Sequence, residues 1–262
     1  DPDHQSELNS LTEEHQLPEG RWKRILRKNL LPDDKFQLYG HRIVDGPVVV
    51  KFLKLLALTY ISIVVTFYYV RWVGYLEHDG RYNLQDFWTY ESTLVASDMM
   101  VFFVVGRLYK QRGVDHMAWV LAALACNLYS SFSAILPFLQ HSVTLYEMHC
   151  TWPWMLWVFL VVVIFIVVAV VYLHVRYAVR MKIVWLKLIE LTLCVIFFML
   201  PYVSDPYFHL HHWYVGWLVG MHFNFDVWWS RATMAWCFGA YVNGIAVWGR
   251  DPVLTCGYAM HL

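Results

Sequence analysis

Three histidines in five residues form the part of this sequence best suited to chemistry. The run His209–Trp213 reads HLHHW and follows Asp205 and Pro206, a residue that ends helices. His209 and His212 are three residues apart, so they would share one face of a helix. Two imidazoles with a nearby carboxylate can hold Zn²⁺ or a similar metal ion. The spacing therefore predicts a metal site, with zinc as the candidate cofactor.

Further ligands for such a site would come from other segments of the chain. The candidate metal ligands are His209, His211, His212, Asp98, Glu147 and His149. An alternative interpretation leaves the histidines as groups at a membrane interface that hydrogen-bond backbone carbonyls and lipid head groups. The sequence contains neither a second complete histidine box nor HExxH. A di-iron desaturase and a zinc peptidase of that class are therefore not indicated.

Charged and amide side chains also interrupt the apolar segments. A charge inside a membrane span costs ~2.5–3.5 kcal/mol on insertion scales, so Asp98 needs a partner or water. It is either a functional group or a structural one bonded to a serine, while Arg107 is expected to reach the interface. Lys187 and Glu190, three residues apart, are expected to neutralise one another. Asn243 lies among small residues and could bond across helices.

The composition shows what surrounds these residues. Apolar residues make up 59% of the 262, charged residues 15%, and mean hydropathy is +0.42. Soluble domains have about 45–50% apolar and about 25% charged residues. We therefore expect an all-α, polytopic transmembrane helical bundle in contact with membrane lipids. Lys and Arg balance Asp and Glu at 20 each, so no basic excess points to nucleic acid.

Seven apolar segments are candidate spans, each set against the ~20 residues that a bilayer requires. They are 48–70, 93–108, 117–139, 154–173, 183–203, 212–225 and 231–248. The sixth is short, so an alternative with six spans stands. Residues 1–46 are expected to form a polar cytoplasmic arm with a basic interfacial helix at Trp22–Leu31, residues 47–250 the bundle, and residues 251–262 a tail.

The distribution of Lys and Arg indicates the orientation. With the N-terminus in the cytoplasm and seven spans, every Lys and Arg except Arg71, Arg81 and Arg250 lies on the cytoplasmic side, as the positive-inside rule expects. Seven spans would also place Cys150 and Cys256 on the same outer side, where a disulfide could join them. With six spans that disulfide could not form.

The C-terminal part resembles the last spans of the LCCL-domain membrane proteins of fungi and protists. The matching residues are His211, His212, Gly239, Asn243, Gly244, Ile245, Ala246, Trp248, Gly249 and Asp251. The matching segments cover about a fifth of the chain. The Cys-rich LCCL domain that follows the first span in that family is missing here, since residues 71–91 contain no Cys. The resemblance implies a polytopic endomembrane or surface protein.

Three functions are compatible with these features. The first is a non-enzymatic subunit or scaffold of a membrane assembly, with other membrane proteins or further copies as partners. The second is a metal-dependent intramembrane lipid hydrolase, with zinc at the histidine run and Asp98 or Glu147 as base. The third is an ion-coupled transporter using Asp98 and Glu190, although inverted repeats are missing. The first is preferred, because no complete catalytic motif is present.

Overall fold

The computed structural model describes residues 48–73, 82–110, 113–133, 136–139, 145–198 and 212–250. The regular structure of these residues is helical and includes no strand, so the all-α prediction is confirmed for this part of the chain. The helices are α3 (Val48–Val73), α4 (Leu84–Asp86), η1 (Phe87–Glu91), α5 (Ser92–Val105), η2 (Gly113–Asp115), α6 (Met117–Ser133), η3 (Pro137–Leu139), α7 (Leu145–Cys150), α8 (Trp154–Arg180), α9 (Val184–Phe198), α11 (His212–Gly220) and α12 (Trp228–Trp248). The predicted arm, with its interfacial helix, and the predicted tail lie outside the described residues.

Two of the described helices are long and apolar enough to cross a membrane. They are α3, with 26 residues, and α8, with 27. α6 is apolar but shorter, and α5, α9 and α11 have 14, 15 and 9 residues. The structure thus supports membrane association through α3 and α8, while the full set of seven spans stays a prediction.

The second predicted span starts earlier and ends earlier than the hydropathy indicates. Backbone helix runs without a break from Leu84 through η1, a π-helical turn, to Val105. Asn83 caps its start, because its side-chain oxygen accepts a hydrogen bond from the Asp86 amide at 3.0 Å. The helix ends at Gly106, and Arg107 then takes the left-handed conformation with φ of 54°. Local capping therefore sets both ends.

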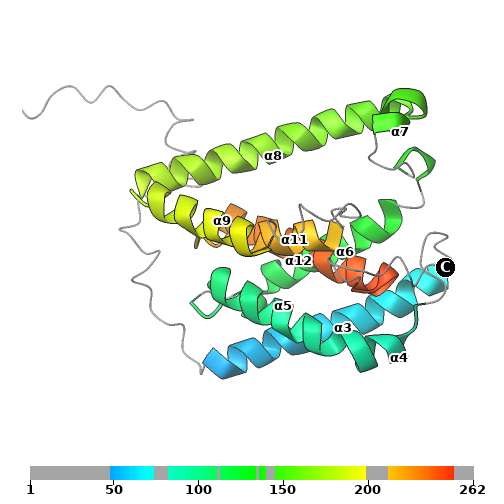
Figure 1. Cartoon of the computed structure of the whole chain (residues 1–262), viewed down its shortest axis with the longest axis horizontal. Helices are drawn as coiled ribbons and strands as arrows, with labels where there is room; N and C mark the ends of the chain where they lie inside the picture. The colour runs from blue at the N-terminus through cyan, green and yellow to red at the C-terminus, as the bar shows by residue number, and fades with distance from the viewer. Residues whose placement is uncertain are drawn as a thin grey trace, which may run out of the picture. The chain divides into compact units, whose positions relative to one another are not determined.

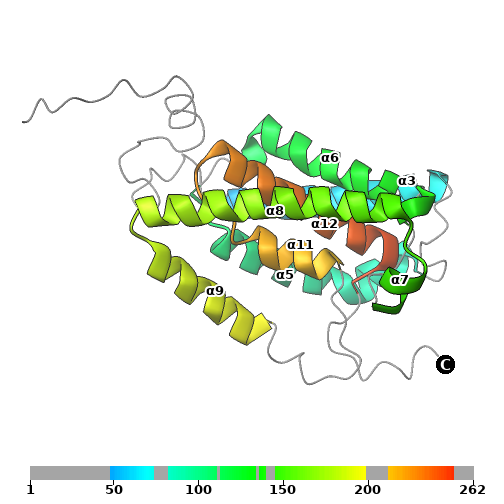
Figure 2. The ribbon, with the colours of Figure 1, turned by 90° about the horizontal axis from the view of Figure 1, so that it is seen from above.

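The central element is α12, which packs against α6, α11 and α3 (Figures 1 and 2). Small residues allow this close packing. A Cβ on Gly239 would lie 2.3 Å from the carbonyl oxygen of Ala123 and 2.8 Å from the Cβ of Cys126, both on α6. Aromatic rings fill the remaining space, with Phe238 5.1 Å from the ring of Trp119. Most side chains of α12 are consequently buried, with Trp228 and Trp236 as its exposed residues.

α8 and α9 are peripheral to this bundle. Only Leu156, Tyr177 and Ala178 of α8 are buried, and only Cys194 of α9. The chain turns between the two helices at Lys182, where φ is 57°. In Figures 1 and 2, α8 runs along one side of α11 and α12, and α9 folds back from its end. Most apolar side chains of these two helices face outward.

Candidate functional site

Asp98 lies at the centre of a buried charged cluster between α5 and the end of α12. Its carboxylate receives two hydrogen bonds from Arg250, from Nε to Oδ2 at 2.7 Å and from Nη2 to Oδ1 at 2.9 Å. Asp98 is only 8% exposed, so both charges are largely out of water. A two-pronged Arg–carboxylate pair is the strongest common form of protein ion pair. The intramembrane charge predicted from the sequence is therefore neutralised by Arg250.

Three aromatic residues complete the surroundings of this pair. Tyr241 donates its hydroxyl hydrogen to Asp98 Oδ2 at 3.0 Å, and the indole of Trp217 donates to the backbone carbonyl of Asp98 at 2.8 Å. The guanidinium of Arg250 lies 5.4 Å from the ring centroid of Trp213, a cation–π contact. Each oxygen of the carboxylate thus has a donor, and this carboxylate is held in place rather than free to react.

A second carboxylate, Glu91, ties the start of α5 to the end of α12. Its Oε2 accepts hydrogen bonds from the Arg250 amide at 3.0 Å and from the Tyr82 hydroxyl at 2.9 Å. Gly249 makes this approach feasible: its φ is +85°, and a Cβ there would lie 2.9 Å from Glu91 Oε1 and from the Tyr82 ring. Burial, with the nearby Glu91 charge, raises the pKa of Tyr82, so the phenol stays a donor.

The opposite end of α5 belongs to another charged cluster, which includes the predicted Lys187–Glu190 pair. Lys187 Nζ lies 3.3 Å from Glu190 Oε2, and Arg107 donates to the same oxygen at 2.8 Å. Asn224 donates to Glu190 Oε1 at 2.9 Å and to the Val105 carbonyl at 2.7 Å, and its oxygen accepts from Lys187. Arg107 was expected at the lipid interface, yet it joins this pair. We call these four side chains the Lys187 cluster.

A neutral polar network joins α12 to α6 and α3 inside the bundle. Asn243 donates to Ser131 Oγ at 2.9 Å and to both oxygens of Asn127 at 3.3 Å. Asn127 in turn donates to Thr66 Oγ1 on α3. All four side chains are buried, which agrees with interhelical bonding by Asn243. This network holds helices together and leaves no side chain displayed in a cavity.

The metal prediction rests mostly on side chains that the structure does not describe. Of the candidate ligands, Asp98 is engaged by Arg250, and His149 is exposed at the end of α7. Among the described side chains, no group of three His, Cys, Asp or Glu could hold a metal ion. Outside the described residues or side chains lie His209, His211, His212 and Glu147. Zinc binding by the histidine run accordingly stays a prediction.

The predicted disulfide between Cys150 and Cys256 also stays a prediction. Cys150 ends α7 and is exposed. Cys256 lies beyond the last described residue, Arg250. The exposed thiol of Cys150 is nonetheless useful as a probe of orientation.

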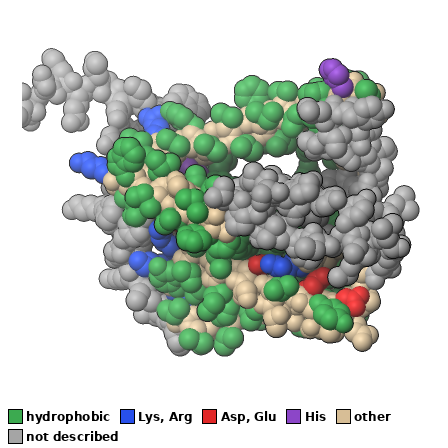
Figure 3. Space-filling model, in the orientation of Figure 1, with side chains coloured by type: hydrophobic (Ala, Val, Ile, Leu, Met, Phe, Trp, Pro, Cys, Tyr) green, Lys and Arg blue, Asp and Glu red, His purple; other side chains and the backbone are tan. Residues whose placement is uncertain are grey.

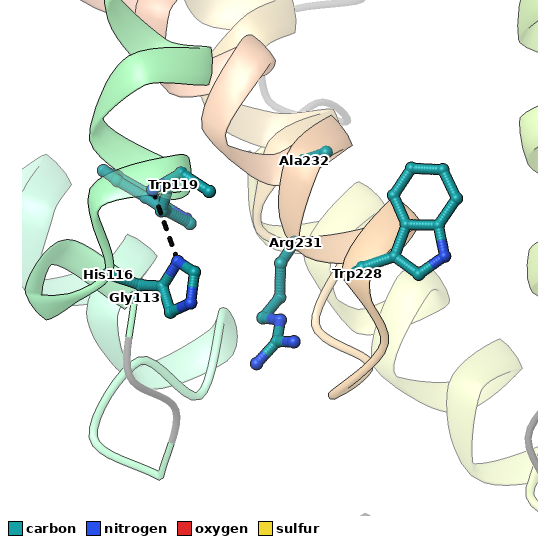
Figure 4. A pocket seen from close by; sticks show the side chains of 7 residues that line it. Gly113, His116, Trp119, Trp228, Arg231 and Ala232 are labelled. Carbon is teal, nitrogen blue, oxygen red and sulfur yellow. Dashed lines mark hydrogen bonds between the residues drawn. The ribbon is translucent and has the colours of Figure 1, made fainter. Parts of the chain in front are cut away.

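A small cavity of about 140 Å³ lies between the starts of α6 and α12 (Figure 4). His116, Trp119, Trp228 and Arg231 contribute to its lining. The Ala118 amide donates to His116 Nδ1 at 3.3 Å, and Arg231 pairs with Asp226 at 2.9 Å. Its volume is well below the ~300–1,000 Å³ of typical ligand pockets. We therefore interpret this cavity as a gap in side-chain packing.

Sequence reasoning missed the partner of Asp98, although one signal pointed to it. Arg71 and Arg250 are exceptions to the positive-inside count, so each would need a local reason to lie on the outer side. Arg250 binds Asp98, and Arg71 donates to the carbonyl of Tyr82 at 2.9 Å. Arg250, an exception to the positive-inside count, and Asp98, a carboxylate predicted inside a span near the same side of the membrane, could therefore have been predicted to pair.

The contacts described above stabilise charge and join helices, and they leave neither Asp98 nor Glu190 without a cationic partner. No family model, no curated protein and no solved structure matches the chain.

Proposed function

We propose that this protein is a non-enzymatic subunit or scaffold of a larger membrane assembly. In this proposal it spans the membrane seven times, with the N-terminus in the cytoplasm. The observation that carries the proposal is α8, a helix of 27 residues that is apolar on every face from Trp154 to Val171 and whose side chains are mostly exposed. A helix that is hydrophobic all round is covered either by lipid or by other protein.

The attachment of α8 to the bundle supports a partner on its other faces. The contacts concentrate near its C-terminal end, where His174 Nε2 lies 3.0 Å from Ser230 Oγ and the His174 ring packs on Phe225 and Trp229. The first half of α8 instead exposes large rings, including Trp154 at 71% and Phe165 at 70%. Aromatic side chains are enriched where proteins meet. This half of α8 is the proposed docking surface.

The ion pairs favour this structural role over ion coupling. A coupling carboxylate has to bind and release its ion, whereas Asp98 and Glu190 are each held by Arg and further hydrogen bonds. The same contacts weigh against Asp98 as the base of a hydrolase. These observations support a structural role for Asp98 and Glu190, in which their charges hold the helices together.

The charge distribution supports the proposed orientation. On the face shown in Figure 3, most of the Lys and Arg lie toward the end where α8 turns into α9, whereas Asp and Glu, with one basic side chain beside them, lie toward the other end. Arg176, Arg180 and Lys182 all belong to the first of these ends. Basic residues are retained on the cytoplasmic side. This distribution supports a cytoplasmic α8–α9 turn in the proposed orientation.

The partner can be tested by photo-crosslinking in the native membrane. With a benzophenone amino acid in place of Phe165, we expect an adduct to one polypeptide of fixed mass, which is either a second copy or another chain. The same probe at Ile61, an equally exposed position on α3 (63%), serves as the matched control. Native mass spectrometry of the unmodified complex should show the same added mass. A 31.1 kDa monomer carrying only lipid, with only lipid adducts at Phe165, would refute the proposal.

The orientation can be tested with the exposed thiol of Cys150. In sealed vesicles of cytoplasmic-side-in orientation, treated with a mild reductant, we expect a membrane-impermeant maleimide to label Cys150 from outside. Both chains carry Cys256→Ser, because seven spans would place that thiol on the outer side as well. The control adds Cys150→Ser and Lys182→Cys, which moves the probe to the α8–α9 turn. That thiol should react only after the vesicles are permeabilised. The reverse pattern would invert the topology.

A further inference from the structure

A cavity of about 420 Å³ opens between α8, α9 and α11, and neither the scaffold role nor the charged clusters account for it. Its volume falls in the range of ligand pockets. The walls are mainly aliphatic, with Val171 and Val175 from α8, Leu191 and Val195 from α9, and Leu218 and Val219 from α11. This aliphatic lining suits a hydrocarbon chain.

Three of the described side chains in the lining are polar or charged. They are His174 from α8, Lys187 from α9 and His222 from the segment that follows α11. On α9, Lys187, Leu191 and Val195 recur every four residues, so they follow one face over ~12 Å of helix. The cavity thus combines one cationic side chain with an apolar lining that continues along α9, which is the pattern of a site for an amphiphile.

The charges around Lys187 favour an anion. The carboxylate nearest to Lys187 is Glu190, whose Oε2 is shared with Arg107. Two cations, Lys187 and Arg107, thus share one carboxylate, so an anionic group beside Lys187 would balance the remaining positive charge. His222 gives a second, independent indication: its Nε2 is buried and has no hydrogen-bond partner among the described residues. A buried polar atom of this kind costs free energy until a partner reaches it.

We infer that this cavity binds one anionic phospholipid of the cytoplasmic leaflet. Its phosphate lies beside Lys187 and His222, and an acyl chain follows Leu191 and Val195. The cytoplasmic leaflet is the one that carries anionic lipids, and the α8–α9 turn lies on that side in the proposed orientation. The inference rests on the proposed membrane embedding and orientation but needs no protein partner.

Lipid retention by the full-length chain tests the inference. The protein is purified in detergent, stripped of lipid and titrated with phosphatidic acid or phosphatidylcholine under native mass spectrometry. We expect about a fivefold preference for phosphatidic acid at one site, the effect of a single lysine near a lipid surface. Lys187→Met should abolish this preference, and the matched control Lys182→Met, an exposed lysine five residues earlier, should keep it.

A second variant separates binding from folding. Leu191→Trp fills the cavity from its wall without changing any charge, so we expect loss of the bound lipid at unchanged thermal stability. Equal retention in Leu191→Trp and the unmodified protein would overturn the inference, as would equal losses in Lys187→Met and Lys182→Met. Competition by inorganic phosphate as strong as by the lipid would exclude the acyl chain. None of these outcomes alters the crosslinking result at Phe165, so the two proposals can fail separately.

Discussion

Replacing Arg250 by Met is expected to lower the free energy of unfolding by about 3–5 kcal/mol, because the carboxylate of Asp98 would stay buried without its partner. Asp98 is 8% exposed and receives two of its hydrogen bonds from this guanidinium. The free energy can be measured by titrating SDS into the protein in dodecylmaltoside micelles and following tryptophan fluorescence. This is the largest single effect that the described contacts predict.

Two controls show whether the loss comes from the stranded charge. Combining Arg250→Met with Asp98→Asn removes both charges and should recover most of the stability, since a neutral pair avoids the cost of a lone buried ion. Arg231→Met breaks the ion pair with Asp226, whose side chains are 31% and 36% exposed, and should cost no more than about 1 kcal/mol. If Arg250→Met and Arg231→Met cost the same, Asp98 is not buried as described.

Gly239→Ala should destabilise the protein by about 1–3 kcal/mol, because the added methyl would overpack the contact between α12 and α6. The new Cβ would meet the Ala123 carbonyl oxygen at 2.3 Å, and a backbone atom cannot move aside as the end of a side chain can. The same SDS titration measures the change.

The sign of this effect is itself informative. At an unhindered helical position, Ala in place of Gly stabilises by up to about 1 kcal/mol. A gain of stability in Gly239→Ala would therefore contradict the close approach of α6 and α12. Leu121→Met, on the exposed side of α6, serves as the control and should leave stability nearly unchanged.

Local pattern was sufficient to predict where the two longest helices begin. The apolar runs from Val48 and from Trp154 begin where α3 and α8 begin, because long uninterrupted hydrophobicity decides membrane-length helices without help from neighbours. The start of the helix at Leu84 was missed, since it depends on the Asn83 cap and on Phe87, which is fully buried by its tertiary contacts. Hydropathy alone carries neither signal.

The charged clusters divide in the same way. Lys187 and Glu190 are three residues apart, so helical geometry alone brings them together. Arg107 reaches Glu190 across 83 positions of sequence, and only the folded bundle places it there. The sequence was therefore sufficient to predict ion pairs within one helix, but not the partners that other helices supply.

The separation of Asp98 from Arg250 has a consequence for how the protein is made. The two residues are 152 positions apart, so a ribosome working at about 5–20 residues per second would synthesise Asp98 roughly 8–30 s before Arg250. Throughout that interval the nascent chain holds an acidic group in a predicted membrane span without its final counter-ion. A chain whose translation stops before Arg250 would therefore keep the Asp98 carboxylate without the guanidinium that neutralises it in the folded protein.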